Sequence, residues 1–133
     1  MAGSPQFAVE LNNNTIVYNS IDHSGGSGVR VNAWAGKSSV LGTNNIIYFN
    51  TSNTKDNNQC SSEAGSIDIV YSSVLETMPG DGNIVDDPLF VNADKDDYHL
   101  SAQSPCINTG NPSLPSDLDD SRSDMGALPY LDN

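Results

Sequence analysis

The sequence predicts an all-β fold in which short parallel strands stack in the successive turns of a β-helix, also called a solenoid. Asn, Ser, Asp and Gly are abundant whereas Lys, Arg and Glu are scarce, a composition that favours turns over helices. Three segments, residues 13–19, 44–50 and 66–72, each contain two β-branched residues followed by Tyr and framed by Asn or Ser. Their tyrosines lie at positions 18, 48 and 71, and steps of 30 and 23 residues indicate a repeat architecture.

Stacking of these segments makes definite predictions about the core. Matching residues of neighbouring turns lie about 4.8 Å apart in such a fold. Alignment on the tyrosines predicts one of two inward aliphatic stacks, formed either by Ile16, Ile46 and Ile69 or by Val17, Ile47 and Val70. The same alignment places Asn14 over Asn44 at a corner, where a ladder of side chains satisfies backbone groups that the turn leaves unpaired.

The other segments of the first 85 residues are interpreted as strands and loops of the same turns. Residues 28–34 alternate apolar and polar side chains and predict a strand. The unequal steps between tyrosines indicate one longer loop, placed in residues 20–28 or 32–39. The polar run 51–59 is interpreted as a surface loop, and residues 74–85 as a Gly-rich loop. An antiparallel β-sandwich, which is also built from short strands, is the alternative fold.

The last third of the chain consists of short apolar runs separated by Pro, Gly, Asn and Asp. In order it reads Asp-Asp-Pro-Leu-Phe-Val at 86–91, Asp-Tyr-His-Leu at 97–100, Ser-Pro-Cys-Ile-Asn-Thr-Gly at 104–110, and an acidic tail at 117–130 that contains Met-Gly-Ala-Leu-Pro-Tyr. This order resembles the closing segment of bacterial secreted right-handed parallel β-helix proteins, which contain pectate-lyase-like repeats. Four motifs in one order indicate architecture, whereas proteins with different functions share this ending.

The resemblance implies a division of the chain into three parts. Residues 1–6 are interpreted as a remnant or disordered start, residues 7–85 as β-helix turns, and residues 86–133 as closing strands with an acidic C-terminal cap. Five apolar side chains of the cap are expected to plug the end of the core: Phe90, Leu100, Ile107, Leu128 and Tyr130. The resemblance also implies that the chain is the C-terminal piece of a longer coil with an extracellular or cell-surface location.

The net charge of −12 is concentrated in the second half of the chain. Residues 76–133 hold twelve acidic and two basic side chains, which gives them a net charge of −10. An acidic surface repels phosphate backbones and anionic lipids, so nucleic acids and membranes are poor candidates for partners. No segment reaches the roughly 18 apolar residues of a membrane-spanning helix.

Two groups of residues are candidates for covalent or metal chemistry. Cys60 and Cys106 are the only cysteines, and the pair is compatible with a disulfide, with two free thiols or with one of each. Four carboxylates within eight residues form a candidate Ca²⁺ site: Asp117, Asp119, Asp120 and Asp124. The alternative is a solvated turn in which Arg122 neutralises one or two of these acids. No resident cofactor other than this Ca²⁺ is a candidate.

Aromatic residues are the candidates for binding carbohydrate. Trp34 lies in a segment interpreted as a loop, and Tyr48 belongs to the repeated set with Tyr18 and Tyr71. An outward stack of such rings suits sugar rings, whereas an inward stack belongs to the core. His99 lies inside a predicted strand and is interpreted as a structural, partly buried imidazole.

The functional hypothesis is a non-catalytic C-terminal β-helix module and cap that binds glycans or a surface along its side. The alternative, which the resemblance implies, is a fragment of a polysaccharide lyase or glycoside hydrolase. Four residues are candidates for a catalytic face in that case: Asp68, Asp22, Arg30 and Lys37. A polysaccharide is the expected partner. An uncovered first turn also predicts self-association through its open strand edges.

Overall fold

The computed structural model describes residues 6–32, 37–54 and 58–131. These residues form short strands joined by turns, together with one short 3-10 helix, η1 (Ala93–Lys95). The strands in chain order are β1 (Gln6–Asn12), β2 (Thr15–Val17), β3 (Ser20–Ile21), β4 (Val29–Asn32), β5 (Lys37–Thr43), β6 (Ile46–Tyr48), β7 (Thr51–Ser52), β8 (Cys60–Ala64), β9 (Ser66–Val70), β10 (Ser73–Val74), β11 (Phe90–Asn92) and β12 (Asp97–Leu100).

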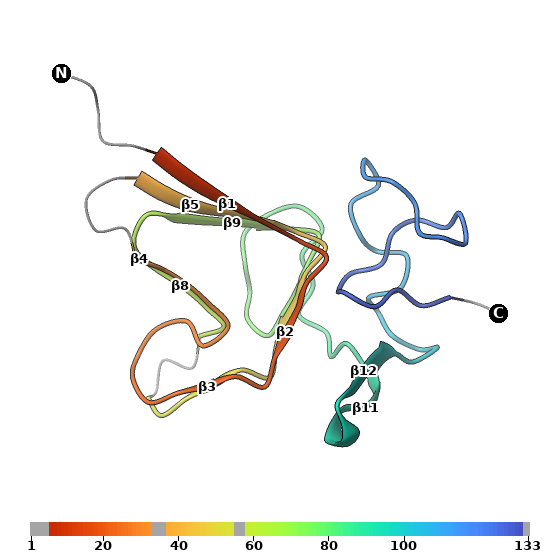
Figure 1. Ribbon diagram of the computed structural model, residues 1–133, viewed down its shortest axis with the longest axis horizontal. Helices are drawn as coiled ribbons and strands as arrows, with labels where there is room; N and C mark the ends of the chain where they lie inside the picture. Colours follow the sequence, from red (N-terminus) through yellow and green to blue (C-terminus); the bar gives the residue numbers. More distant parts are fainter. Residues whose placement is uncertain (1–5, 33–36, 55–57, 132–133) are drawn as a thin grey trace.

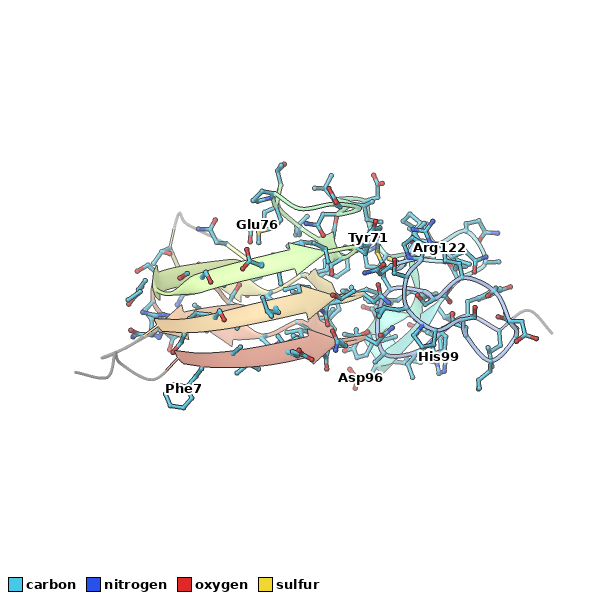
Figure 2. All side chains as sticks on the ribbon, turned by 90° about the horizontal axis from the view of Figure 1, so that it is seen from above. Phe7, Tyr71, Glu76, Asp96, His99 and Arg122 are labelled. Atoms are coloured by element: carbon cyan, nitrogen blue, oxygen red, sulfur yellow. The ribbon has the colours of Figure 1, made fainter. Side chains whose placement is uncertain are left out.

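Strands β1 to β10 pair in parallel with the equivalent strand of the next turn of the chain (Figures 1 and 2). β5 lies between β1 and β9, and β6 lies between β2 and β10. β3 pairs with β7, and β4 pairs with β8. The chain therefore returns to the same sheets in the same order. This pairing confirms an all-β fold of stacked parallel strands and excludes the antiparallel β-sandwich.

The register differs from the tyrosine alignment by one residue between the first and second turns and by four residues between the second and third turns. Partners in the first and second turns lie 31 residues apart, as Ile16 and Ile47 do. Partners in the second and third turns lie 27 residues apart, as Ile47 and Val74 do. The inward stack is therefore Ile16, Ile47 and Val74, and both predicted stacks are wrong. The alignment fails because Tyr18 has Phe49, and not the next tyrosine, as its partner.

The step from the second to the third turn is shorter because the chain needs fewer residues to pass from β8 to β9 than from β4 to β5. The chain advances seven residues from Asn32 of β4 to Ser39 of β5, whereas the equivalent step from Ala64 to Ser66 takes two. The additional residues are therefore located between Asn32 and Ser39, which is one of the two positions predicted for the longer loop, although residues 33–36 lie outside the described part of the chain. The polar run at residues 51–59 was predicted to be a surface loop. It begins with strand β7 and ends at Gln59, which is buried.

A ladder of polar side chains at one corner links the turns in this register. The backbone N–H of Asn14 donates to Oδ1 of Asn45 at 2.9 Å, and that of Asn45 donates to Oγ of Ser72 at 3.0 Å. The N–H of Ser72 donates in turn to Oδ1 of Asn83 at 3.1 Å. The sequence predicted such a ladder, but with Asn44 in the place of Asn45, an error that follows from the same tyrosine alignment.

A second ladder lies at the next corner. The N–H and the Nδ2 of Asn19 both donate to Oδ1 of Asn50 at 2.9 Å. The N–H of Asn50 donates to Oε1 of Gln59 at 3.0 Å, and Nε2 of Gln59 returns a hydrogen bond to the Asn50 carbonyl at 2.9 Å. Asn50 and Gln59 are buried, so these bonds satisfy groups that water does not reach.

The middle sheet, β2–β6–β10, has a packed cluster on each of its faces. Ile47 and Val74 belong to the first cluster, which the strands of the turns enclose. Ile46 and Tyr48 alternate with Ile47 and belong to a second cluster. Residues of the last third complete this second cluster: Leu100, Cys106 and Met125, with Phe90, Ile107 and Tyr130 partly buried against them. β6 is consequently buried on both faces.

The last third of the chain lies beside the stack (Figure 1), whereas the sequence predicted that it covers the end of the core. All of the predicted plug residues except Leu128 pack in the second cluster, against the middle sheet. Leu128 is 37% exposed. The loop at residues 74–85, which precedes this segment, lies against the third turn. Its Met78 packs on the first cluster, and its Ile84 forms a β-bridge with Ser73.

One buried amide joins the stack to the last third. The carbonyl of Asn44 accepts from the N–H of Gly126 at 2.7 Å, and its Oδ1 accepts from the N–H of Asn111 at 2.7 Å. Its Nδ2 donates to Oγ of Ser123 at 3.2 Å. Asn44 has a left-handed backbone with a φ of 60°, a conformation that Asn tolerates better than most residues. A position predicted for the corner ladder therefore anchors the C-terminal segment.

The corner ladder predicts a large loss of stability for Asn45→Ala. Oδ1 of Asn45 accepts from both the N–H and Nδ2 of Asn14, and its Nδ2 donates to the Leu11 carbonyl at 2.7 Å. Because each unsatisfied buried polar group costs about 1–3 kcal/mol, we expect the free energy of unfolding in urea to fall by about 2–4 kcal/mol. The control is the exposed Asn53→Ala, with an expected loss below about 0.5 kcal/mol. Equal losses would contradict the ladder.

Candidate functional site

The candidate site includes two aromatic side chains that lie at matched positions of the first and second turns. Tyr18 follows β2 and Phe49 follows β6, and both have left-handed backbones, with φ values of 56° and 57°. The strand is thus interrupted at the same point in each turn, and the two rings lie against each other. Their centroids are 5.0 Å apart and their planes are 12° from parallel. Tyr18 is 49% exposed, so the stack presents an aromatic face to solvent.

Rings from the antiparallel β11–β12 hairpin extend this stack. Tyr98 of β12 stacks on Tyr18 with a centroid distance of 6.0 Å. Phe90 of β11 meets Tyr98 in an edge-to-face contact at 5.4 Å. Phe49 also contacts Tyr48 edge-on at 4.7 Å, which connects the surface rings to the second cluster. The stacked turns and the hairpin therefore share one continuous aromatic cluster.

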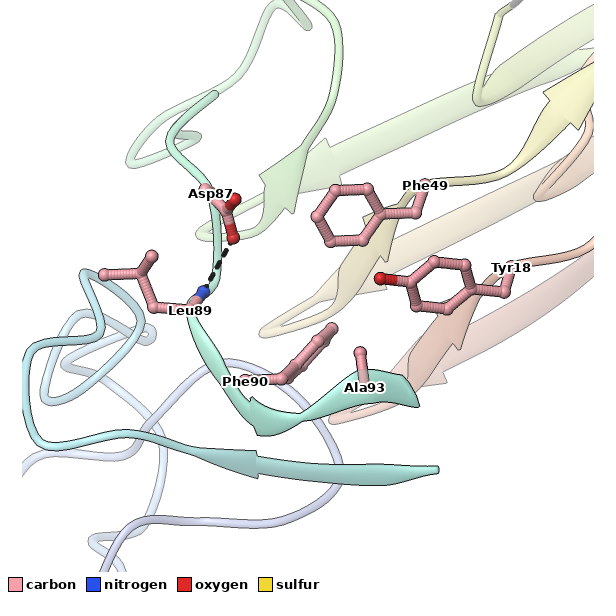
Figure 3. A pocket seen from close by; sticks show the side chains of 6 residues that line it. All are labelled: Tyr18, Phe49, Asp87, Leu89, Phe90 and Ala93. Carbon is pink, nitrogen blue, oxygen red and sulfur yellow. Dashed lines mark hydrogen bonds between the residues drawn. The ribbon is translucent and has the colours of Figure 1, made fainter. Parts of the chain in front are cut away.

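A pocket of about 220 Å³ opens beside these rings, where the stack meets the last third of the chain. We call it the junction pocket, and its lining residues are Tyr18, Phe49, Asp87, Leu89, Phe90 and Ala93. Figure 3 shows the hydroxyl of Tyr18 pointing into the space between Phe49, Asp87 and Phe90. Asp87 is the charged residue among these six.

Asp87 is fixed at the pocket by its own backbone. Its Oδ1 accepts from the N–H of Leu89 at 2.8 Å (Figure 3). Leu89 has a left-handed φ of 53°, and the intervening Pro88 is buried, so this short turn is tightly constrained. Among the described residues, Oδ2 of Asp87 has no hydrogen-bond partner. The carboxylate therefore has an oxygen with which to accept a hydrogen bond from a ligand.

Acidic side chains set the electrostatic environment of the rings. Burial, and then the charges of Asp87 and Asp94, raise the pKa of the Tyr18 hydroxyl. The Tyr98 hydroxyl donates to Oδ1 of Asp96 at 3.0 Å, and burial together with this hydrogen bond raises its pKa as well. Both phenols are therefore protonated at neutral pH. The site combines aromatic faces, a hydroxyl and a carboxylate, which together can hold a ring-shaped polar ligand.

Tyr48, one of the two predicted stacking residues, is buried in the second cluster. Tyr48 is 5% exposed, and its hydroxyl donates to the Val85 carbonyl at 2.7 Å, so its ring offers no free face. Trp34, the other predicted stacking residue, lies outside the described residues. The correct register of 31 residues would have found the site, because it pairs Tyr18 with Phe49.

The four predicted calcium ligands do not form one site. Within residues 6–32, 37–54 and 58–131, no group of three or more His, Cys, Asp and Glu side chains is arranged to hold a metal ion. Oδ2 of Asp117 accepts from the N–H of Asp124 at 2.9 Å. Oδ1 of Asp119 accepts from the N–H of Ser121 at 3.0 Å, and Asp120 has a left-handed φ of 63°. These residues shape the backbone of a tight turn.

Asp124 is the buried member of the four, with 1% exposure. Its two oxygens accept from the N–H groups of Asn108 at 2.7 Å and Tyr130 at 2.6 Å. Burial raises the pKa of Asp124, and these hydrogen bonds offset only part of that effect. Arg122, the residue expected to neutralise such acids, donates its Nε to the Gly110 carbonyl at 2.6 Å. The role of Asp124 is therefore to hold the C-terminal tail together.

Cys60 and Cys106 are free thiols, which overturns the disulfide alternative. Cys60 belongs to the first cluster and Cys106 to the second, so the two residues lie in different cores. Burial raises the pKa of Cys60 to about 12 and that of Cys106 to about 11. Both thiols are protonated at neutral pH and serve as small core side chains.

The residues considered for a catalytic face are spread over three sheets, with Lys37 and Asp68 both in the β1–β5–β9 sheet. Arg30 of β4 forms an ion pair with Glu63 of β8. Asp68 lies in β9 and is exposed, and Asp22 directly follows β3. The side chain of Lys37 lies outside the described part of the chain. The contacts of the described residues therefore do not bring this predicted set together.

A second pocket of about 330 Å³ lies within the last third of the chain. Its lining residues are His99, Leu100, Pro129, Tyr130 and Leu131. His99 was expected to be partly buried but is exposed, and its Nδ1 lies 2.7 Å from Oδ1 of Asp97. The hydrogen bond from His99 lowers the pKa of Asp97. This pocket lacks the stacked rings of the junction pocket and is the weaker candidate.

Comparisons of the chain with protein-family models, with curated proteins and with solved structures found no match. Among the described residues, the structure contains no helix with the length and apolar character needed to cross a lipid bilayer.

Because both thiols are buried, we expect them to react with the thiol reagent DTNB at pH 8 only after the protein is unfolded. At this pH only about one thiol in a thousand or fewer is ionised when the pKa is about 11 or 12. We expect no reaction in the native protein and the reaction of both cysteines after unfolding in urea without reductant. Absence of reactive thiols in urea would reveal a disulfide and contradict the assignment.

Proposed function

We propose that this chain is the closing module of an extracellular bacterial right-handed parallel β-helix, and that it binds carbohydrate in the junction pocket without cleaving it. The observation on which the binding function depends is the parallel pair of the exposed Tyr18 and the half-buried Phe49 beside Asp87. The architecture and the chemistry of the pocket support the proposal separately.

The regular path of the chain supports the β-helix. Parallel partners recur at steps of 31 and then 27 residues, and polar ladders run between turns at two corners. Such quasi-one-dimensional stacking, in which each turn contacts its neighbours, is typical of solenoids. The order of motifs in residues 86–130 resembles the ending of bacterial secreted β-helix proteins, and the proposed location depends on this resemblance alone.

The chemistry of the junction pocket suits a sugar. A sugar ring has apolar C–H faces, which pack on aromatic planes, and polar edges, which need hydrogen-bond partners. Tyr18 and Phe49 provide the planes, while the Tyr18 hydroxyl and Oδ2 of Asp87 provide a donor and an acceptor at the edge. At about 220 Å³ the pocket is smaller than the roughly 300–1,000 Å³ of drug-sized sites, so it suits one ring of a longer chain.

The number of carboxylates that line the pocket supports binding without cleavage. Glycoside hydrolases use two carboxyl groups that flank the scissile bond at separations of about 5–5.5 or 6.5–9.5 Å. Asp87 is the carboxylate among the six lining residues. Arg30, the base considered for a lyase, is held in an ion pair on the β4–β8 sheet. We therefore expect the polymer to be bound and released intact.

Tyr18→Ala tests this function. Removal of the Tyr18 ring takes away the exposed aromatic side chain of the pocket and its hydroxyl, so we expect binding of oligosaccharides to weaken about five- to tenfold, which corresponds to a loss of roughly 1–1.4 kcal/mol. Calorimetric titration with oligosaccharides of plant, algal and bacterial polymers measures this change.

Phe7→Ala is the matched control. Phe7 of β1 is 65% exposed and lies far from His99 and Asp96 in Figure 2. We expect its replacement to leave affinity unchanged. Failure of the unaltered chain to bind any member of the panel would contradict the proposed function. Release of new sugar ends in proportion to protein concentration would identify an enzyme instead.

The edges of the first turn predict self-association of the 133-residue chain. β1 pairs with β5 on one edge only, and Phe7 and Val9 are 65% and 54% exposed. Open strand edges are templates for pairing with another copy, and a charge that points inward from an edge strand prevents it. We expect sedimentation velocity to show concentration-dependent dimers that Val9→Lys abolishes. A monomer at all concentrations, with β1 amides protected from hydrogen exchange, would contradict this prediction.

A further inference from the structure

The junction pocket combines negative charge with aromatic faces. Asp87 lines the pocket, and Asp94 lies in η1 next to the lining residue Ala93. The fields of these two carboxylates reach the Tyr18 hydroxyl, and the fields of Asp87 and Asp86 reach the Tyr48 hydroxyl; in both cases they add to the effect of burial in raising the pKa. A ligand in the pocket therefore experiences a negative potential.

No basic side chain among the described residues forms an ion pair with Asp87. The two ion pairs among the described residues lie elsewhere, in the β4–β8 sheet and within β12. Lys95 of η1 makes no ion pair with Asp87, and Arg122 is engaged by the Gly110 carbonyl and lies 5.9 Å from the ring centroid of Tyr71. Asp87 thus faces the pocket as an uncompensated charge.

Aromatic faces beside a carboxylate favour organic cations. The π-face of Tyr or Phe attracts an ammonium group that lies within about 6 Å of the ring centroid. Tyr18, Phe49 and Phe90 border the same small space as Asp87 (Figure 3). A neutral sugar would pack on the rings and donate a hydrogen bond to Asp87 but would carry no charge opposite to that of the carboxylate, whereas a uronic acid would place its own carboxylate against Asp87. Only an amino sugar would use both features.

We infer that the junction pocket selects ammonium-bearing sugars, with glucosamine units of a polymer as the ligand class, and disfavours uronic acids. The inference rests on the proposed carbohydrate-binding function and names its substrate class. The sugar ring packs against the aromatic side chains that line the pocket, and the ammonium group lies within reach of the Asp87 carboxylate. This selectivity is opposite to that expected of a protein that binds acidic polysaccharides such as pectin.

Three hexasaccharides of matched length test the inference. The glucosamine hexamer has ammonium groups, the N-acetylglucosamine hexamer replaces each with a neutral amide, and the galacturonate hexamer has carboxylates. Calorimetric titration at pH 6 and low salt is expected to give about fivefold or greater preference for the glucosamine hexamer over the acetylated one. Binding of the galacturonate hexamer is expected to be the weakest, and added salt should reduce the differences.

Asp87→Asn isolates the charge from the shape of the pocket. The asparagine retains an oxygen for the Leu89 N–H but loses the carboxylate charge. We expect this variant to bind the glucosamine and N-acetylglucosamine hexamers equally, while its affinity for the acetylated hexamer stays within about twofold of the original. The control is Asp68→Asn, which removes the same charge from an exposed position on β9 and should preserve the selectivity. Circular dichroism verifies that both variants fold.

The outcomes separate this inference from the proposed function. Selectivity for the glucosamine hexamer that is lost in Asp87→Asn and kept in Asp68→Asn supports the inference. Equal binding of all three hexamers, tighter binding of galacturonate, or unchanged selectivity in Asp87→Asn overturns it while carbohydrate binding stands. Failure of all three to bind overturns this inference, and the full polysaccharide panel then decides the proposed function.

Discussion

The hydrogen bonds of the corner ladders fix the register between turns, and the rest of the structure depends on that register. Asn14, Asn45 and Ser72 each donate a backbone N–H to a side-chain oxygen of the next turn. A slip of one residue would leave buried donors unpaired and would turn each strand's inward side chains to the opposite face. The same register that directs Ile47 into the first cluster also places Tyr18 against Phe49.

A sheet with two buried faces explains where the last third of the chain lies. Ile46 and Tyr48 would be exposed on the outside of the stack if no segment covered them, and the second cluster removes them from water. Asn44 fixes the covering segment from the stack side, and Asp124 fixes it from within. Because the hairpin is part of this segment, the junction pocket forms at the boundary of the two parts.

The sequence was informative about local structure and uninformative about contacts between turns. The repeated β-branched pairs and the turn-rich composition predicted stacked short strands, because those signals act over a few residues. The tyrosines gave a wrong register, by one residue in the first step and by four in the second, because local sequence patterns do not record which residues pair between turns. Tyr48, Cys60 with Cys106, and the Asp117–Asp124 group were candidates by residue type alone. The junction pocket joins Tyr18 and Phe49, which lie at matched positions of two turns, to Phe90 of the hairpin, and no local pattern in the sequence links the hairpin to the turns.

A crystal structure of the chain grown with a short glucosamine oligomer tests the central claim most directly, namely that the boundary between the stack and the last third is a sugar-binding site. The account predicts density for one sugar ring against Tyr18 and Phe49, with its amine near Asp87. An oligomer bound at another place while the junction pocket holds only water would contradict the claim, as would a pocket filled by the protein's own side chains.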